Sequence, residues 1–126
     1  MKKIISTLNA PAAIGPYSQA VEVNGTLYIS GQIPVNPATG KIVEGGVTEQ
    51  AEQVIANIKA ILAEAGLGIE NVVKSTVFLA DMSLFGEMNE VYKKHYINKP
   101  PARSTIAVKG LPMGALVEIE TIAVKL

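Results

Sequence analysis

The pattern of apolar and polar positions changes its period along the chain, and its first part predicts a β-hairpin. Two short apolar stretches, residues 20–23 and 26–30, flank Asn24-Gly25, a dipeptide typical of two-residue turns between antiparallel strands. We expect the second strand to end at Gly31, because the prolines that follow remove hydrogen-bond donors from a central strand. Residues 33–46 also contain glycine turn signals and are predicted to form an exposed loop.

From Thr48 onward the apolar positions recur at the spacing of an α-helix. They are Ala51, Val54, Ile55, Ile58, Leu62 and Ala65. Thr48 is the expected N-cap, Glu49 and Glu52 fall in the first turn, and Gly66 is the expected end. This segment therefore predicts one long amphipathic helix.

The pattern then switches to a strand and back to a helix. The β-branched segment 72–80 predicts a strand, and Asp81 or Ser83 is suited to cap the helix that follows. The apolar stripe of that helix consists of Leu84, Phe85, Met88, Val91, Tyr92 and Tyr96, with His95 projecting within it and Asn89 at its margin.

Two further strands complete the predicted fold. Pro100-Pro101 ends the second helix, and strand patterns follow at residues 103–108 and 116–126. The order of hairpin, helix, strand, helix, strand, strand fits an α+β fold with two helices packed on one face of a mixed β-sheet. With 126 residues, the chain has the size of a single domain, residues 1–126.

Composition narrows the chemistry that this domain can perform. Eleven Lys and Arg balance eleven Asp and Glu, so the chain lacks the basic excess of a nucleic-acid-binding protein. It has no cysteine and one histidine, His95, which excludes thiolate catalysis and zinc sites built on Cys or paired His. Carboxylates, Arg, Lys, Tyr, hydroxyls and backbone groups must supply any reaction.

The low content of charged residues predicts that part of the surface is covered. They make up 17% of the chain, against roughly 25% in an average globular protein. A closed homo-oligomer is the simplest explanation, and a monomer with a patchy surface is the alternative. No segment approaches a membrane span, and polar residues interrupt the N-terminal apolar run too early for a signal peptide, so we expect a cytoplasmic protein.

Two glutamates interrupt an apolar side of the last predicted strand. Glu118 and Glu120 share this side with apolar residues before and after them. A carboxylate there must be paired, must raise its pKa or must border a cavity, unless the side is a solvated rim. Arg103 follows two prolines that fix its backbone and is the candidate partner, because its planar guanidinium suits bidentate capture of a carboxylate. A structural ion pair between Arg103 and a glutamate is the alternative.

Two other residues carry weaker signals. His95 lies among apolar neighbours, and no Ser-His-Asp context surrounds it, so we expect a packed or partly exposed imidazole and not a catalytic base. Tyr17 follows the turn Gly15-Pro16, where its ring either closes a pocket or packs on its own sheet.

Three separated parts of the chain are similar to the motifs of one known family. They are Ala10-Pro11-Ala12-Ala13-Ile14-Gly15-Pro16-Tyr17-Ser18-Gln19-Ala20, Ser30-Gly31-Gln32-Ile33-Pro34, and Pro101-Ala102-Arg103-Ser104-Thr105 with Val117-Glu118-Ile119-Glu120. In this order, and over about residues 5–124, the chain closely resembles the RidA (YjgF/YER057c/UK114) family.

The resemblance implies a fold, an assembly and an activity. The fold is chorismate-mutase-like, and the assembly is a homotrimer with a central barrel-like arrangement of sheets and a cleft at each subunit interface. The activity is deamination of reactive 2-imino acids, such as 2-iminobutyrate and 2-iminopropionate, to 2-oxo acids and ammonia, with no metal or organic cofactor. Carried onto this sequence, Arg103 is the clamp for the substrate carboxylate and Glu120 is the acid that activates water. The implied substrate-binding residues are Tyr17, Ser30, Gly31, Asn89, Arg103 and Thr105, with main-chain contacts at Gly31 and Thr105.

This reading predicts that Glu120 moves one proton in both directions, first from water and then to the departing amine. Two alternatives stay open. The same cleft fits a regulatory module that binds a 2-oxo acid or another small carboxylate without turnover. An endoribonuclease or translation-inhibitor role, attached to some relatives, is disfavoured by the zero net charge and the absence of an evident stacking platform.

Overall fold

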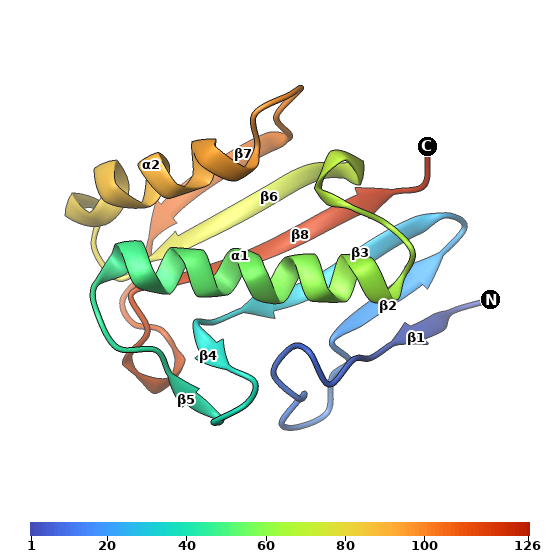
Figure 1. Ribbon diagram of the computed structural model, residues 1–126, viewed down its shortest axis with the longest axis horizontal. Coiled ribbons are helices and arrows are strands. Elements are labelled where there is room, and N and C mark those ends of the chain that lie inside the picture. Colours follow the sequence, from blue (N-terminus) through green and yellow to red (C-terminus); the bar gives the residue numbers. More distant parts are fainter.

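A mixed β-sheet with two helices on one face forms the body of the protein (Figure 1). The computed structural model describes residues 1–126. The strands are β1 (Lys3–Ile5), β2 (Ala20–Val23), β3 (Thr26–Gln32), β6 (Val72–Leu79), β7 (Ala102–Ala107) and β8 (Val117–Val124). Their order in the sheet is β1-β2-β3-β8-β6-β7, and β7 lies parallel to β6 while every other neighbouring pair is antiparallel. The predicted α+β class with a mixed sheet is confirmed.

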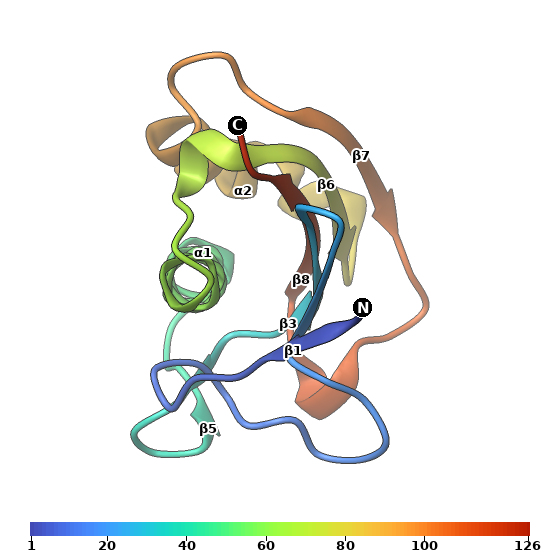
Figure 2. The same cartoon turned by 90° about the vertical axis from the view of Figure 1, so that its right-hand side faces the viewer.

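The helices α1 (Val47–Glu64) and α2 (Phe85–His95) cover the same side of the sheet. Figure 2 shows the strands nearly edge-on, with α1 on one side of them. Ile58 and Leu62 of α1 are fully buried in one apolar cluster with Ile119 of β8. Full burial of each such side chain stabilises the fold by about 1.5–3 kcal/mol. The helical spacing of apolar residues therefore decides which side of α1 meets the sheet.

The alternation of residues along β8 gives the sheet two different faces. Val117, Ile119 and Ala123 are fully buried under the helices, as the two-residue period predicts. Glu118 and Glu120 lie on the other face, which no helix covers. We call these the helix-covered face and the helix-free face.

The predicted hairpin is confirmed, but its second strand is longer than expected. Asn24 and Gly25 have φ angles of 51° and 79°, the left-handed values that both positions of this tight turn require. The expected end at Gly31 is wrong, because β3 continues to Gln32 through an irregularity in its pairing with β8. Such a bulge leaves extra residues of one strand unpaired, and regular pairing with the neighbouring strand resumes after it.

Two local expectations about the first half of the chain need correction, and one strand was not expected. Residues 33–46 are not only loop, since β4 (Val35–Asn36) and β5 (Lys41–Ile42) form a small separate sheet. Thr48 is not the N-cap of α1; Gly46 occupies that position, and its N–H donates to Glu49 Oε1 at 2.8 Å. The short strand β1 had no sequence signal.

The sequence predicts the end of α1 correctly, but Glu52 lies beyond its first turn, and α2 does not begin at a predicted cap. Gly66 has a φ of 75° just beyond α1, which confirms the predicted stop. Asp81 accepts a hydrogen bond from the Ser83 N–H at 2.8 Å and caps the short 3₁₀ turn Met82–Leu84 that leads into α2. The prediction that Asp81 or Ser83 caps the second helix is therefore wrong, because the N-cap of α2 is Leu84, which has no capping side chain, and Asp81 caps only the turn before it.

Candidate active site

Arg103, the only arginine of the chain, is held at the edge of the sheet by α2. It pairs in register with fully buried Ser75, so its side chain lies on the helix-covered face. Its Nη1 donates to Asn89 Oδ1 at 2.8 Å. Its Cζ lies 4.7 Å from the centroid of the Tyr92 ring and 5.5 Å from that of Phe85. The guanidinium is thus fixed by one amide and two aromatic rings.

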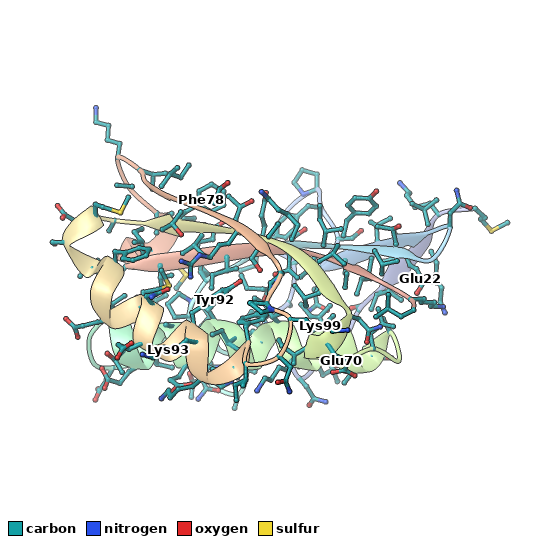
Figure 3. All side chains as sticks on the ribbon, turned by 90° about the horizontal axis from the view of Figure 1, so that it is seen from above. Glu22, Glu70, Phe78, Tyr92, Lys93 and Lys99 are labelled. Atoms are coloured by element: carbon teal, nitrogen blue, oxygen red, sulfur yellow. The ribbon has the colours of Figure 1, made fainter.

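The helical repeat of α2 explains why these three residues meet one guanidinium. Phe85, Asn89 and Tyr92 are separated by four and three positions, the spacing that aligns side chains on one side of a helix. Tyr92 lies between α2 and the sheet (Figure 3), and its ring stacks on Tyr96 with centroids 4.2 Å apart. Burial raises the pKa of both tyrosines, so their hydroxyls stay protonated at neutral pH.

No carboxylate of the same chain neutralises Arg103, which takes part in none of the protein's salt bridges. The expected alternative, a structural ion pair with a glutamate, is therefore absent from the chain. A guanidinium held by uncharged groups keeps its charge available for an anion, and its fork geometry suits a carboxylate. Thr105 follows on the same face of β7, and its buried hydroxyl has no hydrogen-bond partner.

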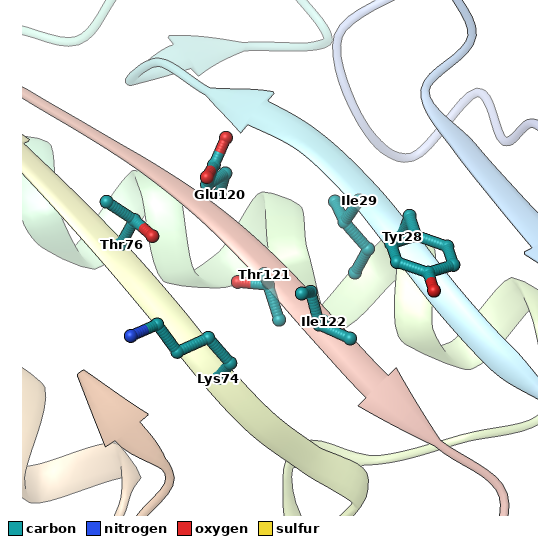
Figure 4. A pocket seen from close by; sticks show the side chains of 7 residues that line it. All are labelled: Tyr28, Ile29, Lys74, Thr76, Glu120, Thr121 and Ile122. Atoms are coloured by element: carbon teal, nitrogen blue, oxygen red, sulfur yellow. The ribbon is translucent and has the colours of Figure 1, made fainter. Parts of the chain in front are cut away.

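Glu120 lies on the opposite face of the sheet. It pairs in register with Thr76 and is exposed. Figure 4 views this face with α1 behind the strands; the hollow there has a volume of about 150 Å³. It is lined by Tyr28, Ile29, Lys74, Thr76, Glu120, Thr121 and Ile122. Lys74 is the basic residue that lines this hollow, and it forms no salt bridge with Glu120.

Ser30 and Gly31 occupy the irregular part of β3 beside Glu118. The Ser30 hydroxyl donates to the Ser18 carbonyl at 2.6 Å, which ties β3 to the preceding loop. The Glu118 side chain lies directly over Gly31, where a Cβ atom would overlap its carboxylate. Burial raises the pKa of Glu118, and the negative charge of Glu120 raises it further.

Tyr17 shares a cavity with Gly31. The cavity has a volume of about 290 Å³, and no charged residue lines it. The half-exposed Tyr17 ring forms part of its wall, and the Tyr17 hydroxyl accepts a hydrogen bond from the Ile14 N–H at 3.3 Å. Of the two readings of Tyr17, the structure thus supports closure of a pocket.

The predicted site residues therefore form two separate groups within one chain. Arg103, Asn89 and Thr105 gather between α2 and β7 on the helix-covered face. Glu120 lies on the helix-free face, and Gly31, which the Glu118 side chain overlies, lines the cavity of Tyr17. The register explains the separation: Arg103 and Thr121 both align with Ser75, so Glu120, the neighbour of Thr121, must point the other way.

His95 belongs to neither group. The prediction that it projects within the apolar stripe of α2 is wrong, because its ring turns toward α1. The ring is partly exposed, which confirms the prediction of a packed or partly exposed imidazole. Its Nε2 lies 2.6 Å from Glu52 Oε1, and its Nδ1 lies 2.9 Å from Lys59 Nζ. A hydrogen bond from Lys94 at 2.7 Å, followed by the one from His95, lowers the pKa of Glu52. This network joins the two helices at the surface.

The sequence interpretation missed the contacts of three residues that shape the site. Phe85 and Tyr92 were placed in the apolar stripe, yet their rings contact Arg103. Their spacing from Asn89 is the signal that points to a shared function on one side of α2. Glu118 was noted as a carboxylate on an apolar face, but nothing in the sequence places it over Gly31.

Comparison with known proteins assigns the family. The profile described as Endoribonuclease L-PSP matches residues 7–125. The chain therefore belongs to this family, the RidA family that its motifs resemble.

Similar proteins cover the chain from end to end. The 2-iminobutanoate/2-iminopropanoate deaminase of Mus musculus is 54% identical over 125 residues, which are 99% of this chain and 93% of that protein. The protein of the same name from Homo sapiens is 49% identical and covers 99% of this chain and 91% of its own length.

Solved structures of relatives have the same fold. The crystal structure of yeast Mmf1 superimposes with a TM-score of 0.96, at 47% identity and full coverage of both chains. E. coli TdcF with bound serine superimposes with a TM-score of 0.92, at 44% identity, covering 98% of this chain and 99% of that one. No helix of the protein is both long and apolar enough to cross a membrane.

Proposed function

We propose that the protein is an enamine/imine deaminase that hydrolyses 2-imino acids such as 2-iminobutyrate and 2-iminopropionate to 2-oxo acids and ammonia. The observation that carries the proposal is the unneutralised Arg103 guanidinium, held by Asn89 and two aromatic rings at the edge of the sheet. Relatives about half identical over the whole chain bear the name of this deaminase, which supports the same assignment.

The substrate is bound through its carboxylate, which accepts two hydrogen bonds from the Arg103 guanidinium. Each charge-assisted hydrogen bond in a shielded site contributes about 1.5–3 kcal/mol. Because the carboxylate is attached to C2, this pair also fixes the orientation of the imine carbon. The bound serine of the related TdcF structure, a small molecule with a carboxylate, is consistent with a site of this kind.

Hydrolysis then requires a base and an acid. Glu120 takes a proton from the attacking water, whose oxygen adds to C2 and forms a carbinolamine. Protonation of the amine nitrogen breaks the C–N bond, and ammonia leaves as the C2 carbonyl forms. Main-chain groups of Gly31 and Thr105 orient the substrate, while Ser30 and Tyr17 line the cleft. The reaction consumes one water and needs no redox partner.

The complete site lies between subunits in this proposal. Arg103 and Glu120 occupy opposite faces of one sheet, so they meet the same substrate only if they come from different copies of the chain. The helix-free face carries exposed apolar side chains such as Tyr28 and Ile106, which a neighbouring copy would cover. A homotrimer with a central barrel-like arrangement of the sheets satisfies both requirements, since three head-to-tail contacts close a ring.

An assay with a freshly generated imine tests the function. A dehydratase that releases 2-iminobutyrate is combined with a trapping amine, and the rate of 2-oxobutyrate release is measured with and without this protein. We expect clear acceleration by the wild type, none by Arg103→Ala and little by Arg103→Lys, because lysine lacks the planar fork. Lys109→Ala, a change at an exposed cation, is the matched control and keeps full activity.

Other outcomes of this assay separate the alternatives. Tight binding of a 2-oxo acid without any acceleration would support the regulatory module instead of the enzyme. Full activity of Arg103→Ala would exclude the carboxylate clamp. Cleavage of RNA that persists through purification and disappears in Glu120→Ala would support the nuclease role.

A further inference from the structure

Glu118 provides a second carboxyl group beside Glu120, and its side chain occupies a different part of the same face. The two residues are separated by two positions on β8, so their backbones lie about 7 Å apart on the same face. The Glu118 side chain lies over Gly31 of the neighbouring strand, in space that any side chain at position 31 would fill. Glycine at position 31 is thus what allows a carboxyl group to rest there.

The surroundings of the two carboxyl groups differ. Glu118 is half-buried and pairs with Phe78 of β6, whereas Glu120 is exposed and pairs with Thr76 of the same strand. Neither carboxyl group forms a salt bridge, and the segment of β3 beside Glu118, Ser30-Gly31, carries no charge. Lys74 lines the hollow of Glu120, and its Nζ donates to Ser104 Oγ at 3.4 Å.

Two neighbouring carboxylates without a counter-charge resist being ionised together, and the more buried one keeps its proton to a higher pH. Burial is the main cause of the raised pKa of Glu118, and the charge of Glu120 is the second. A pair in which one member stays protonated while the other stays ionised is suited to separate acid and base roles.

We propose that Glu118 is a further catalytic residue of the imine hydrolysis, the acid that donates a proton to the departing amine, while Glu120 serves as the base. This inference rests on the proposed function. It replaces one glutamate that acts as both base and acid with two glutamates, one for each role.

The proton balance of the reaction closes with this division. Glu120 removes a proton from water as the oxygen adds to C2 of the protonated imine. The Glu118 carboxyl then protonates the amine nitrogen of the carbinolamine, and the C–N bond breaks to release ammonia. The proton of the new hydroxyl group returns to the Glu118 carboxylate as the C2 carbonyl forms, and the proton on Glu120 passes to solvent.

The first experiment compares Glu118→Gln with the wild type in steady-state kinetics over a range of pH. We expect kcat to fall about 100-fold with little change in KM, because general acids contribute typically 10²–10⁴-fold while Arg103 still binds the carboxylate. The decline of wild-type kcat toward alkaline pH, where Glu118 loses its proton, should be absent in the variant. Glu22→Gln, on the same sheet but paired with Lys125, is the control and keeps the wild-type profile.

A second variant acts on Glu118 without changing its chemistry. In Gly31→Ala the new Cβ displaces the Glu118 carboxyl group, and because the φ angle of Gly31 is not left-handed, alanine fits the backbone. We expect this variant to lose kcat and the alkaline decline in the same way. If either variant keeps the wild-type kcat and pH profile, Glu118 is not the acid.

A titration that needs no turnover separates this inference from the proposed function. With ¹³C-labelled glutamate, the carboxyl resonance of Glu118 should titrate above the ordinary range of glutamate, and its midpoint should fall in Glu120→Gln. A midpoint in the ordinary range overturns the inference even if the wild type is an active deaminase. A raised midpoint in a protein that does not hydrolyse imines would contradict the proposed function, and with it the catalytic role of Glu118.

Discussion

Two inactive variants should restore each other's activity if the site lies between subunits. Arg103→Ala removes the proposed carboxylate clamp from the helix-covered face of one chain, and Glu120→Gln removes the proposed base from the helix-free face. Each variant alone forms three defective sites in a trimer. A mixed trimer regains an intact site wherever a chain with Arg103 stands next to a chain with Glu120 in the productive order.

The size of the recovery follows from the geometry. In an equal mixture, each site draws its arginine and its glutamate from two different chains, and each chain carries the intact residue with a probability of one half. The expected activity is therefore about a quarter of the wild-type value. The variants are unfolded and refolded together, the mixed composition is verified by native mass spectrometry on chains of different mass, and 2-oxobutyrate release is measured.

Three results would refute the reasoning. Mixed trimers that show no activity above the separate variants would mean that both residues act from one chain, against their positions on opposite faces of the sheet. A protein that remains monomeric at assay concentrations would remove the interface. Substantial activity of Glu120→Gln alone would exclude this residue as the base.

Two further predictions concern the support of Arg103 and the contact between the helices. Tyr92→Leu removes the ring that lies 4.7 Å from the guanidinium, and calorimetry should show about tenfold weaker binding of 2-oxobutyrate. Tyr92→Phe keeps the ring and should bind 2-oxobutyrate like the wild type. Equal loss of binding in both variants would assign the effect to the hydroxyl. The lowered pKa of Glu52 means that its bonds to Lys94 and His95 stabilise the fold above the unfolded pKa and that this contribution is lost as pH falls through the folded pKa. Glu52→Gln should therefore reduce the free energy of unfolding by about 0.5 kcal/mol at pH 7, a small value because the pair is partly exposed, and the difference should vanish toward pH 2 in urea titrations; a constant difference would mean that charge is not its cause.

The sequence alone determined the elements whose signals are local. Helical spacing fixed α1, the Asn24-Gly25 turn fixed the hairpin, and the two-residue period of β8 placed Glu118 and Glu120 opposite the buried residues. It also singled out Arg103, because a planar guanidinium that follows two prolines suits bidentate capture of a carboxylate. The cap of α1 was missed because Gly46 has no capping side chain, and its N–H donates to the Glu49 carboxylate. The small sheet β4–β5 was missed because backbone pairing, which most residue types can form, holds it together.

Only the tertiary structure decided how the candidate residues are grouped. The parallel pairing of β7 with β6 aligns Arg103 with Ser75, and the antiparallel pairing of β8 aligns Ser75 with Thr121. Strand register is set by contacts between segments far apart in the sequence, so no local pattern reveals that Arg103 and Glu120 face opposite ways. For the same reason, the contacts of Tyr92 with Arg103 and of Glu118 with Gly31 exist only once distant strands and helices have packed together.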